Sequence, residues 1–459
     1  MATFGVTHTD NTAAPAARRV AIIGAGFGGL AAGWELSRSG YYVVDVFEAR
    51  NRLGGRVHSV DRFAPNRMTE FGGEFIGGNH PFWLRLARHF GIELESLDSD
   101  EKPAEVIMDG HHYSGDEARA LAEEVNRGHV ELARDAALAV PDEPWNTPDA
   151  ETYDRMSLKQ RIEGMNTTPR AKRAIFIEFL HDMACHPGAM NYLALMCVIK
   201  GHGVEKYWTE TEMFRARSGN QILASHLAAG ISGRIHPDCP VVRIEQDDHG
   251  CRLTLRDGRM CAYPDVVMSV PPSVWHDIEF IPGLPAGFRP QMGSATKFLS
   301  VVRNAYWLPD GETDVMTDRP LGMTWEGASS DSADERLLCS FAGGTIADDL
   351  HSRPFAGREK LLDREFNELL PGFHNSHIKS EFVDWIGDQW MQGGYSFPQP
   401  GAFLSQARIL NDGIGRMHFA GEHASFSFFG FMEGGLHSGF QAAHRLMQRD
   451  RIAIPEDHE

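Results

Sequence analysis

The sequence has few cysteines, less positive than negative charge, and no long hydrophobic run. Its six cysteines show no Cys-x-x-Cys spacing, which favours a reduced compartment and predicts no zinc site. The 22 histidines include no His-Glu-x-x-His metal pattern. A formal net charge of −19 would repel phosphate backbones, so we expect no nucleic-acid partner.

No apolar run reaches the roughly 18 residues that a membrane-spanning helix needs, so no membrane partner is expected. Residues 1–17 lack the apolar core of a secretion signal and are interpreted as a disordered N-terminal segment. These observations predict a cytoplasmic protein. They leave the oligomeric state open, with a homodimer as one alternative.

Glycine, by contrast, is abundant, with 47 residues, many of them in adjacent pairs from one end of the chain to the other. Paired glycines let a backbone approach a ligand closely. Their spread indicates one large ligand that distant segments contact together. At 459 residues the chain also exceeds what one compact core usually supports, so two domains are expected.

The clearest local pattern is a strand, a glycine turn, a helix and a second strand, which begins at residue 20. Between the two apolar strands, Gly24, Gly26 and Gly29 form a Gly-x-Gly-x-x-Gly motif. In this motif the first glycine permits the tight turn, the second admits a pyrophosphate, and the third lets the helix pack on the strand. Glu48 ends the second strand, where a carboxylate accepts ribose hydroxyls and would repel the 2′-phosphate of NADP.

A second glycine turn follows at once and favours FAD over NAD. Gly54 and Gly55 would admit the ligand, and the Arg56 guanidinium offers a fork of donors to a diphosphate. An NAD dehydrogenase needs no further pyrophosphate clamp at this point. For these residues alone, the alternative is an exposed turn with a solvated arginine.

The rest of the chain changes from a helical pattern over residues 81–207 to β-rich segments after residue 240. We therefore predict a mixed α/β fold, with a Rossmann-like FAD-binding domain built from discontinuous segments. A substrate-binding domain with a mixed sheet and helices would be inserted between them. The predicted FAD-binding domain comprises residues 18–79, 212–272 and 381–450, and the predicted substrate-binding domain comprises residues 80–211 and 273–380.

The glycine motif and several later segments together resemble the flavin-containing amine oxidases, a family of monoamine, polyamine and L-amino-acid oxidases. The resemblance covers nearly the whole chain, and the order of the segments makes it specific. The segments are EARNRLGGRV (48–57), EFGGEFIG (70–77), PVVRIE (240–245), MGSATK (292–297) and HFAGEHAS to GFMEGG (418–435). With the first motif, they imply that FAD is contacted by Gly24, Gly26, Gly29, Glu48, Ala49, Arg50, Gly55, Arg56, Gly72, Gly73, Glu74, Phe75, Val241, Gly421, Glu422 and Met432.

The resemblance also implies roles around the flavin ring. Lys297 would hold a water against flavin N5 and assist reoxidation by oxygen, unless it is a surface lysine. Tyr395 and Phe431 would flank the substrate amine as two aromatic walls, unless they are ordinary core residues. Trp385 would pack beneath the flavin. Because Tyr395 stands where some members carry a flavin-linking cysteine, FAD is expected to be noncovalent.

Two charged residues bear on the substrate. In L-amino-acid oxidases the stretch comparable to Glu74 carries an arginine that grips the substrate carboxylate, so this clamp is expected to be absent. The Glu74 carboxylate would suit an ammonium group or set the protonation of a bound amine; alternatively, Glu74 contributes only backbone contacts to the flavin. Arg215 or Arg217 stays a candidate for binding a substrate carboxylate from elsewhere in the chain.

The predicted function is an FAD-dependent oxidase that takes a hydride from the carbon next to an amine and passes the electrons to oxygen. The nearest alternative is an L-amino-acid oxidase that gives a 2-oxo acid, ammonia and hydrogen peroxide. A carbon–carbon desaturase and a non-catalytic FAD-binding protein are more distant alternatives. The predicted catalytic residues are Lys297, Tyr395, Phe431, Glu74 and Trp385, and the predicted substrate contacts are Glu74, Arg215, Tyr395 and Phe431.

Overall fold

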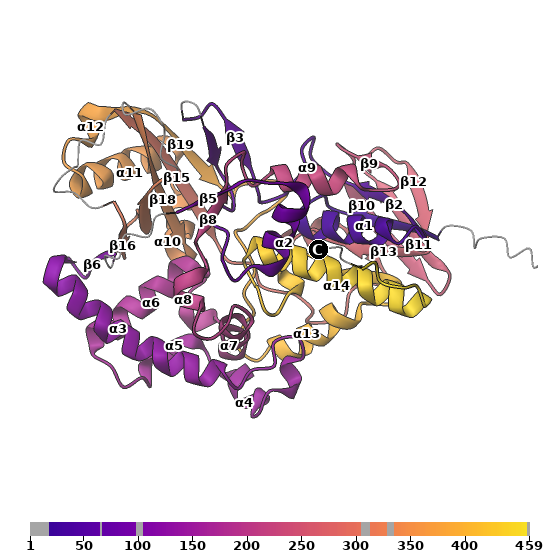
Figure 1. The fold of residues 1–459 in the computed structure, drawn as a ribbon, viewed down its shortest axis with the longest axis horizontal. Coiled ribbons are helices and arrows are strands. Elements are labelled where there is room, and N and C mark those ends of the chain that lie inside the picture. The colour runs from indigo at the N-terminus through magenta and orange to yellow at the C-terminus, as the bar shows by residue number, and fades with distance from the viewer. Residues whose placement is uncertain (1–17, 65–66, 98–103, 304–312, 328–334, 457–459) are drawn as a thin grey trace, which may run out of the picture.

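The computed structural model describes residues 18–64, 67–97, 104–303, 313–327 and 335–456 (Figure 1). The predicted disordered segment at residues 1–17 lies outside these ranges, as do residues 304–307, which end one of the predicted β-rich segments. Within the described ranges, helices and several sheets alternate, so the predicted mixed α/β class is confirmed.

Three distant parts of the chain meet in one five-stranded sheet in which every neighbouring pair is parallel. Its central strands are mostly buried apolar runs, as expected where helices cover both faces of a parallel sheet. The predicted Rossmann-like sheet from discontinuous segments is therefore present. In spatial order its strands are β20 (Met417–Phe419), β13 (Asp265–Met268), β1 (Arg18–Ile23), β2 (Tyr42–Phe47) and β9 (Ile235–His236).

Helices α1 (Phe27–Arg38) and α14 (Met432–Asp450) lie side by side although they come from opposite ends of the chain (Figure 1, indigo and yellow). Glycine makes this contact possible. A Cβ atom on Gly439 would lie 2.4 Å from the Gly28 oxygen, and one on Gly28 would lie 2.5 Å from the Gly421 nitrogen. The N-terminal and C-terminal glycine motifs therefore meet at one end of the parallel sheet.

A seven-stranded mixed sheet forms the second large layer. Its long central strands are antiparallel, whereas β16 pairs with β6 in parallel. In spatial order its strands are β19 (His377–Asp384), β15 (Ala295–Arg303), β18 (Glu335–Gly343), β17 (Met323–Glu326), β16 (Val315–Thr317), β6 (Glu105–Met108) and β7 (His111–Tyr113). Three helices accompany it: α10 (Gly344–Ser352), α11 (Phe355–Leu369) and α12 (Phe373–Ser376).

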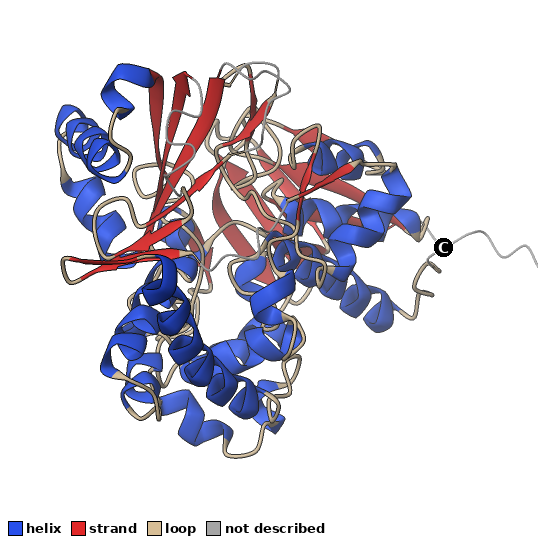
Figure 2. Cartoon of the chain, turned by 60° about the vertical axis from the view of Figure 1, so that its left-hand side comes forward, coloured by secondary structure: helices blue, strands red, loops and turns tan. Residues whose placement is uncertain are grey.

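A group of helices lies on one side of this mixed sheet (Figure 2). Helix α7 is buried almost throughout, and it anchors the largest hydrophobic core of the described chain. The helical pattern predicted over residues 81–207 is confirmed for these helices, but three short strands interrupt it: β6, β7 and the strand Leu94–Ser96. The helices are α3 (Gly115–Ala136), α4 (Ala150–Arg155), α5 (Leu158–Glu163), α6 (Pro169–Asp182), α7 (Tyr192–Gly201) and α8 (Tyr207–Glu210).

Smaller elements connect these layers. A four-stranded sheet has the order β12 (Met260–Tyr263), β11 (Gly250–Leu255), β10 (Val241–Asp247) and β14 (Glu279–Ile281). Two short pairs are β3 (Ser59–Asp61) with β4 (Met68–Glu70), and β5 (Leu94–Ser96) with β8 (Phe214–Ala216). The remaining α-helices are α2 (Pro81–Phe90), α9 (Ile222–Ala229) and α13 (Phe403–Asp412). The predicted domain boundaries stay a prediction.

Among the helices of the described residues, none combines the length and the apolar character that crossing a bilayer requires.

Candidate active site

A cavity of about 1390 Å³ extends from the parallel sheet to the mixed sheet. Sites for a single small ligand usually measure about 300–1,000 Å³. This cavity is therefore large enough for a dinucleotide and a small substrate together. The glycine motifs line one end of it, and α3, α6, α8 and the strands β6, β16 and β17 contribute to the other end.

The first glycine motif forms the turn between β1 and α1. Gly24 has a φ of +100°, which only glycine adopts without strain. A Cβ atom on Gly29 would lie 2.1 Å from the Gly24 oxygen, so this glycine packs the helix onto the turn. A Cβ atom on Gly26 would meet no described atom within 4 Å, because this residue faces the cavity at the start of α1. These positions match the separate roles that the sequence assigns, and they leave room for a phosphate at the helix N-terminus.

Glu48 lies at the end of β2 and lines the cavity with Ala49. Its two carboxylate oxygens accept hydrogen bonds from the backbone nitrogens of Ala25, at 2.7 Å, and Arg50, at 2.8 Å. Burial raises the pKa of Glu48, against the effect of these two bonds. The carboxylate thus holds the glycine turn in place and still faces the space where a ribose would lie.

The two arginines of the second motif have different surroundings. Arg56 lines the cavity, and its Nη1 atom donates to the Gly394 oxygen at 2.9 Å and to Glu422 Oε1 at 2.7 Å. Arg50 is not among the lining residues of the described chain, and its guanidinium forms an ion pair with Asp388. The geometry therefore favours Arg56 over Arg50 as a cofactor ligand, and the predicted role of Arg50 stays untested.

Most other predicted FAD contacts come together on the same cavity wall. The lining residues among them are Gly55, Gly72, Gly73, Glu74, Phe75, Val241, Gly421, Glu422 and Met432. Gly72 has no room for a side chain, since a Cβ atom there would lie 1.8 Å from the Arg56 oxygen. Side chains from both ends of the sequence thus form a continuous groove whose size, glycine lining and polar groups fit FAD.

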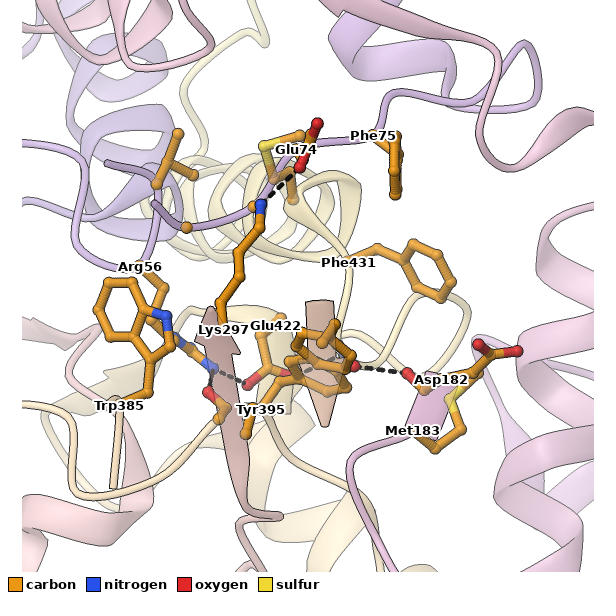
Figure 3. Close-up of a pocket in the computed structure, with 18 of the residues that line it drawn as sticks. Arg56, Glu74, Phe75, Asp182, Met183, Lys297, Trp385, Tyr395, Glu422 and Phe431 are labelled. Atoms are coloured by element: carbon orange, nitrogen blue, oxygen red, sulfur yellow. Dashed lines mark hydrogen bonds and ion pairs between the residues drawn. The ribbon is translucent and has the colours of Figure 1, made fainter. Parts of the chain in front are cut away.

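Lys297 reaches into the cavity from the buried strand β15 (Figure 3). Its Nζ atom donates to the backbone oxygen of Glu70 at 2.8 Å and to Glu74 Oε2 at 2.5 Å. The side chain is buried, so the alternative of a surface lysine is wrong. The partner of Lys297 is a carboxylate that the sequence interpretation had assigned to the substrate or to backbone contacts.

Glu74 is paired on both sides. Besides Lys297, the Nε atom of Arg215 lies 3.2 Å from Glu74 Oε1, and the indole Nε1 of Trp325 donates to the same oxygen at 3.4 Å. Arg215 also lines the cavity, whereas Arg217 pairs with Glu93 and is not among the described lining residues. The structure thus brings Glu74, Lys297 and Arg215 together from three separate segments.

The predicted aromatic walls both line the cavity, as does Trp385 (Figure 3). The Tyr395 hydroxyl donates to the Asp182 backbone oxygen at 2.6 Å, which fixes the ring. The Phe431 ring packs against the buried His202 ring, with 4.4 Å between the ring centroids. Both aromatic side chains are therefore held from behind and present their surfaces to the cavity.

The family model for flavin containing amine oxidoreductases matches residues 27–447. The chain belongs to this family. The family predicted from the sequence is thereby confirmed, and this amine oxidoreductase is an enzyme that uses FAD.

Similar proteins span nearly the whole of this amine oxidoreductase. A flavin-containing amine oxidase of Oncorhynchus mykiss is 23% identical, over 93% of this chain and 85% of that protein. An L-amino acid dehydrogenase of Synechocystis sp. is 24% identical, over 93% of this chain and 94% of that protein. The structure of cyclohexylamine oxidase from Brevibacterium oxydans shares the fold, with a TM-score of 0.83 and 23% identity over 95% of this chain and 100% of that one.

The sequence interpretation missed an acidic wall in the cavity of this amine oxidoreductase. Glu178 and Asp182 lie four residues apart on α6, and Glu212 follows α8. Burial, together with the charges of Glu178 and Glu212, raises the pKa of Asp182 well above its usual range. Burial raises the pKa of Glu212 to about 7, and the charge of Glu74 adds to this effect.

A signal for part of this wall was present in the sequence. Glu178 and Asp182 are spaced by four within the predicted helical stretch KRAIFIEFLHDMA, which places both on one helix face. Two like charges on a buried face are unfavourable unless a ligand or partner compensates them. The Nε2 atom of His129 lies 2.9 Å from Glu178 Oε2 and supplies one such partner.

Proposed function

We propose that this enzyme oxidises small amines with oxygen as the electron acceptor. A hydride leaves the carbon next to the nitrogen, which gives an imine, and water then converts the imine to ammonia and an aldehyde or ketone. Oxygen takes up the electrons and two protons and becomes hydrogen peroxide. The FAD would be held without a covalent bond, because Tyr395 follows the Gly-Gly pair.

The charge of the cavity is the observation that carries this proposal. At the end remote from the glycine motifs, lining carboxylates outnumber lining cations, so the cavity favours a cationic ligand over an anionic one. The carboxylates there are those of Glu74, Glu95, Glu178, Asp314 and Glu326, and the cations are Lys297, Arg215 and Arg336; Asp182 and Glu212, whose pKa values are raised, add two further carboxyl groups.

The aromatic residues would position the amine within this field. Tyr395 and Phe431 present ring faces to the cavity, and such faces favour a nitrogen that bears a charge or a lone pair. Glu212 faces the cavity, where the surrounding protein desolvates its carboxylate although the side chain keeps contact with the solvent of the cavity. With a pKa of about 7, its carboxylate is suited to take the proton that an ammonium must lose before hydride transfer.

When bound, FAD would accept the hydride. The protein binds and orients the substrate and excludes water from the reacting carbon. Lys297, buried on β15, would place its ammonium group where a water is held beside the flavin. The neighbouring Glu70 oxygen and Glu74 carboxylate fix the direction of this side chain.

Product analysis tests the proposed reaction. We expect purified enzyme to release ammonia and hydrogen peroxide in equal amounts from 2-phenylethylamine, and much less from L-phenylalanine. The two compounds differ by one carboxylate, so they form a matched pair. Equal or greater turnover of L-phenylalanine would contradict the assignment to amines.

One observation favours amino acids as the second candidate. Arg215 lines the cavity, and its Nε and Nη1 atoms have no hydrogen-bond partner among the described residues. A guanidinium with unused donors is a good ligand for a carboxylate. The similar Synechocystis protein is named an L-amino acid dehydrogenase, which is consistent with this candidate.

A further inference from the structure

Glu74, Lys297 and Arg215 form a compact charge cluster on the cavity wall, which we call the Glu74 cluster. The three side chains are 7%, 4% and 9% exposed, respectively. They come from the loop after β4, from β15 and from β8, so the fold itself brings them together. Burying three charges is costly unless they compensate one another.

The carboxylate is the centre of this cluster. Glu74 Oε2 receives Lys297 at 2.5 Å, and Glu74 Oε1 faces both Arg215 Nε at 3.2 Å and the Trp325 indole at 3.4 Å. Although burial opposes it, the charges of Lys297 and Arg215 hold the pKa of Glu74 below its usual range. Glu74 is therefore an ionised partner of two protein cations, and it has little capacity left for a substrate ammonium.

Arg215 is only partly satisfied by this arrangement. Its Nε atom is within ion-pair distance of Glu74, yet neither Nε nor Nη1 makes a hydrogen bond within the described part of the chain. A planar guanidinium on a cavity wall has the geometry to bind a carboxylate through two parallel bonds. The Glu74 carboxylate occupies the space beside it, where the carboxylate of an amino acid would otherwise be attracted.

We propose that Glu74 is an internal counter-ion that replaces a substrate carboxylate beside Arg215 and thereby selects amines against amino acids. This inference rests on the proposed oxidation of amines and names the residue that sets its selectivity. Without the charge of Glu74, Lys297 and Arg215 would lose their nearest counter-charge. Glu70 and Glu212 also interact with them, but burial raises the pKa of each of these two carboxyls to about 7. The two cations would then attract an anionic ligand, because the nearest opposite charge is gone.

The test uses the FAD-loaded enzyme and benzoate, a carboxylate probe whose binding is read from the change in flavin absorbance. Glu74→Gln keeps the size of the side chain and removes its charge. We expect this variant to bind benzoate at least tenfold more tightly than the wild type. The double variant Glu74→Gln/Arg215→Gln should lose that gain, because the guanidinium is the group that captures the carboxylate.

Glu178→Gln is the matched control, since it removes another carboxylate of the same cavity, paired with His129, without touching the Glu74 cluster. We expect it to change benzoate affinity by less than threefold. The inference is overturned if Glu74→Gln retains flavin but gains no affinity, if the gain survives in the double variant, or if Glu178→Gln produces an equal gain.

A second variant covers the case in which Glu74→Gln does not retain flavin. Glu74→Asp keeps the charge but withdraws it by one methylene, and at least a threefold gain in benzoate affinity is then expected; unchanged affinity would overturn the inference. Benzoate binding requires no turnover. Amine oxidation without the benzoate gain therefore contradicts only the role of Glu74, and the gain without amine oxidation contradicts only the proposed function.

Discussion

The hydroxyl of Tyr395 donates a hydrogen bond to the backbone oxygen of Asp182, with 2.6 Å between the two oxygens. Tyr395 follows β19, and Asp182 is the last residue of α6, so the bond joins segments 213 residues apart in the sequence. It ties an aromatic wall of the cavity to the acidic wall. The position of this ring on the cavity wall therefore depends on the helical region.

Tyr395→Phe tests this link. The variant keeps the aromatic face but leaves the Asp182 carbonyl without its partner, which costs about 1 kcal/mol of stability. Because the ring is then held less firmly for the substrate, KM should rise, by about fivefold at most. Flavin content should not change. Steady-state kinetics with an amine gives the answer, and Tyr395→Leu is the control: it removes the aromatic face as well, so its kcat/KM should be lower still. Equal kcat/KM values for Tyr395→Phe and Tyr395→Leu would contradict a role for the aromatic face.

Two glycines of the first motif should respond differently to alanine. Gly26→Ala adds a Cβ atom that meets no described atom within 4 Å, so the apoprotein should fold with an unchanged Tm but lose flavin. Gly29→Ala forces a Cβ atom to within 2.1 Å of the Gly24 oxygen, so both folding and flavin binding should suffer. Thermal unfolding of the apoproteins and flavin absorbance separate the two effects. Retention of flavin by Gly26→Ala would show that the cofactor does not approach this backbone.

Arg50 and Arg56 provide a direct comparison for the second motif. Arg56→Met removes the partner of buried Glu422 and a cavity-lining cation, so the Kd for FAD should rise at least about tenfold, or about 1.4 kcal/mol. Arg50→Met removes an ion pair with Asp388 that lies away from the described cavity lining. The Kd for FAD should therefore change by less than about threefold. Titration of each apoprotein with FAD checks this, and similar losses in both variants would contradict the placement of Arg50.

Glu433 should make stability depend on pH. Its carboxylate accepts hydrogen bonds from the backbone nitrogens of Phe82, at 2.8 Å, and Trp83, at 2.9 Å, at the start of α2. Burial raises the pKa of Glu433 to about 7. In the unfolded chain the pKa is about 4.3, so between these values the folded state binds more protons and its stability falls as pH rises.

Glu433→Gln cannot titrate and should remove this part of the pH dependence. The Tm of the wild type minus the Tm of the variant should therefore be more positive at pH 5 than at pH 8. At about 1.4 kcal/mol per pKa unit, the contribution amounts to a few kcal/mol. Thermal unfolding at the two pH values measures it, and a constant difference would show that Glu433 has the same charge in both states.

Much of the fold and of the glycine-lined end of the cavity could be predicted from local sequence patterns. The strand, turn and helix around Gly24 and Gly29 are specified by residues close together in the sequence, because each glycine answers a steric demand of its immediate neighbours. The apolar residues that follow Lys297 in its buried strand were likewise visible as part of the β-rich segments after residue 240. These features could be predicted because short-range geometry determines them.

The charge pairing around Glu74 could not be predicted in this way. Its partner Lys297 is 223 residues away, and only the assembled sheets bring the two side chains to 2.5 Å. The same holds for the acidic wall: the spacing of Glu178 and Asp182 was readable, but its orientation towards the cavity depends on how α6 packs. Long-range packing decides which charges meet, and a local pattern contains no information about it.

Anaerobic reduction of the FAD-loaded enzyme is the most direct measurement of the central claim. When 2-phenylethylamine is added without oxygen, the blue absorbance of the oxidised flavin should disappear, and admission of oxygen should restore it with release of hydrogen peroxide. A flavin that stays oxidised with every amine tested, but is bleached by L-amino acids, would contradict the account.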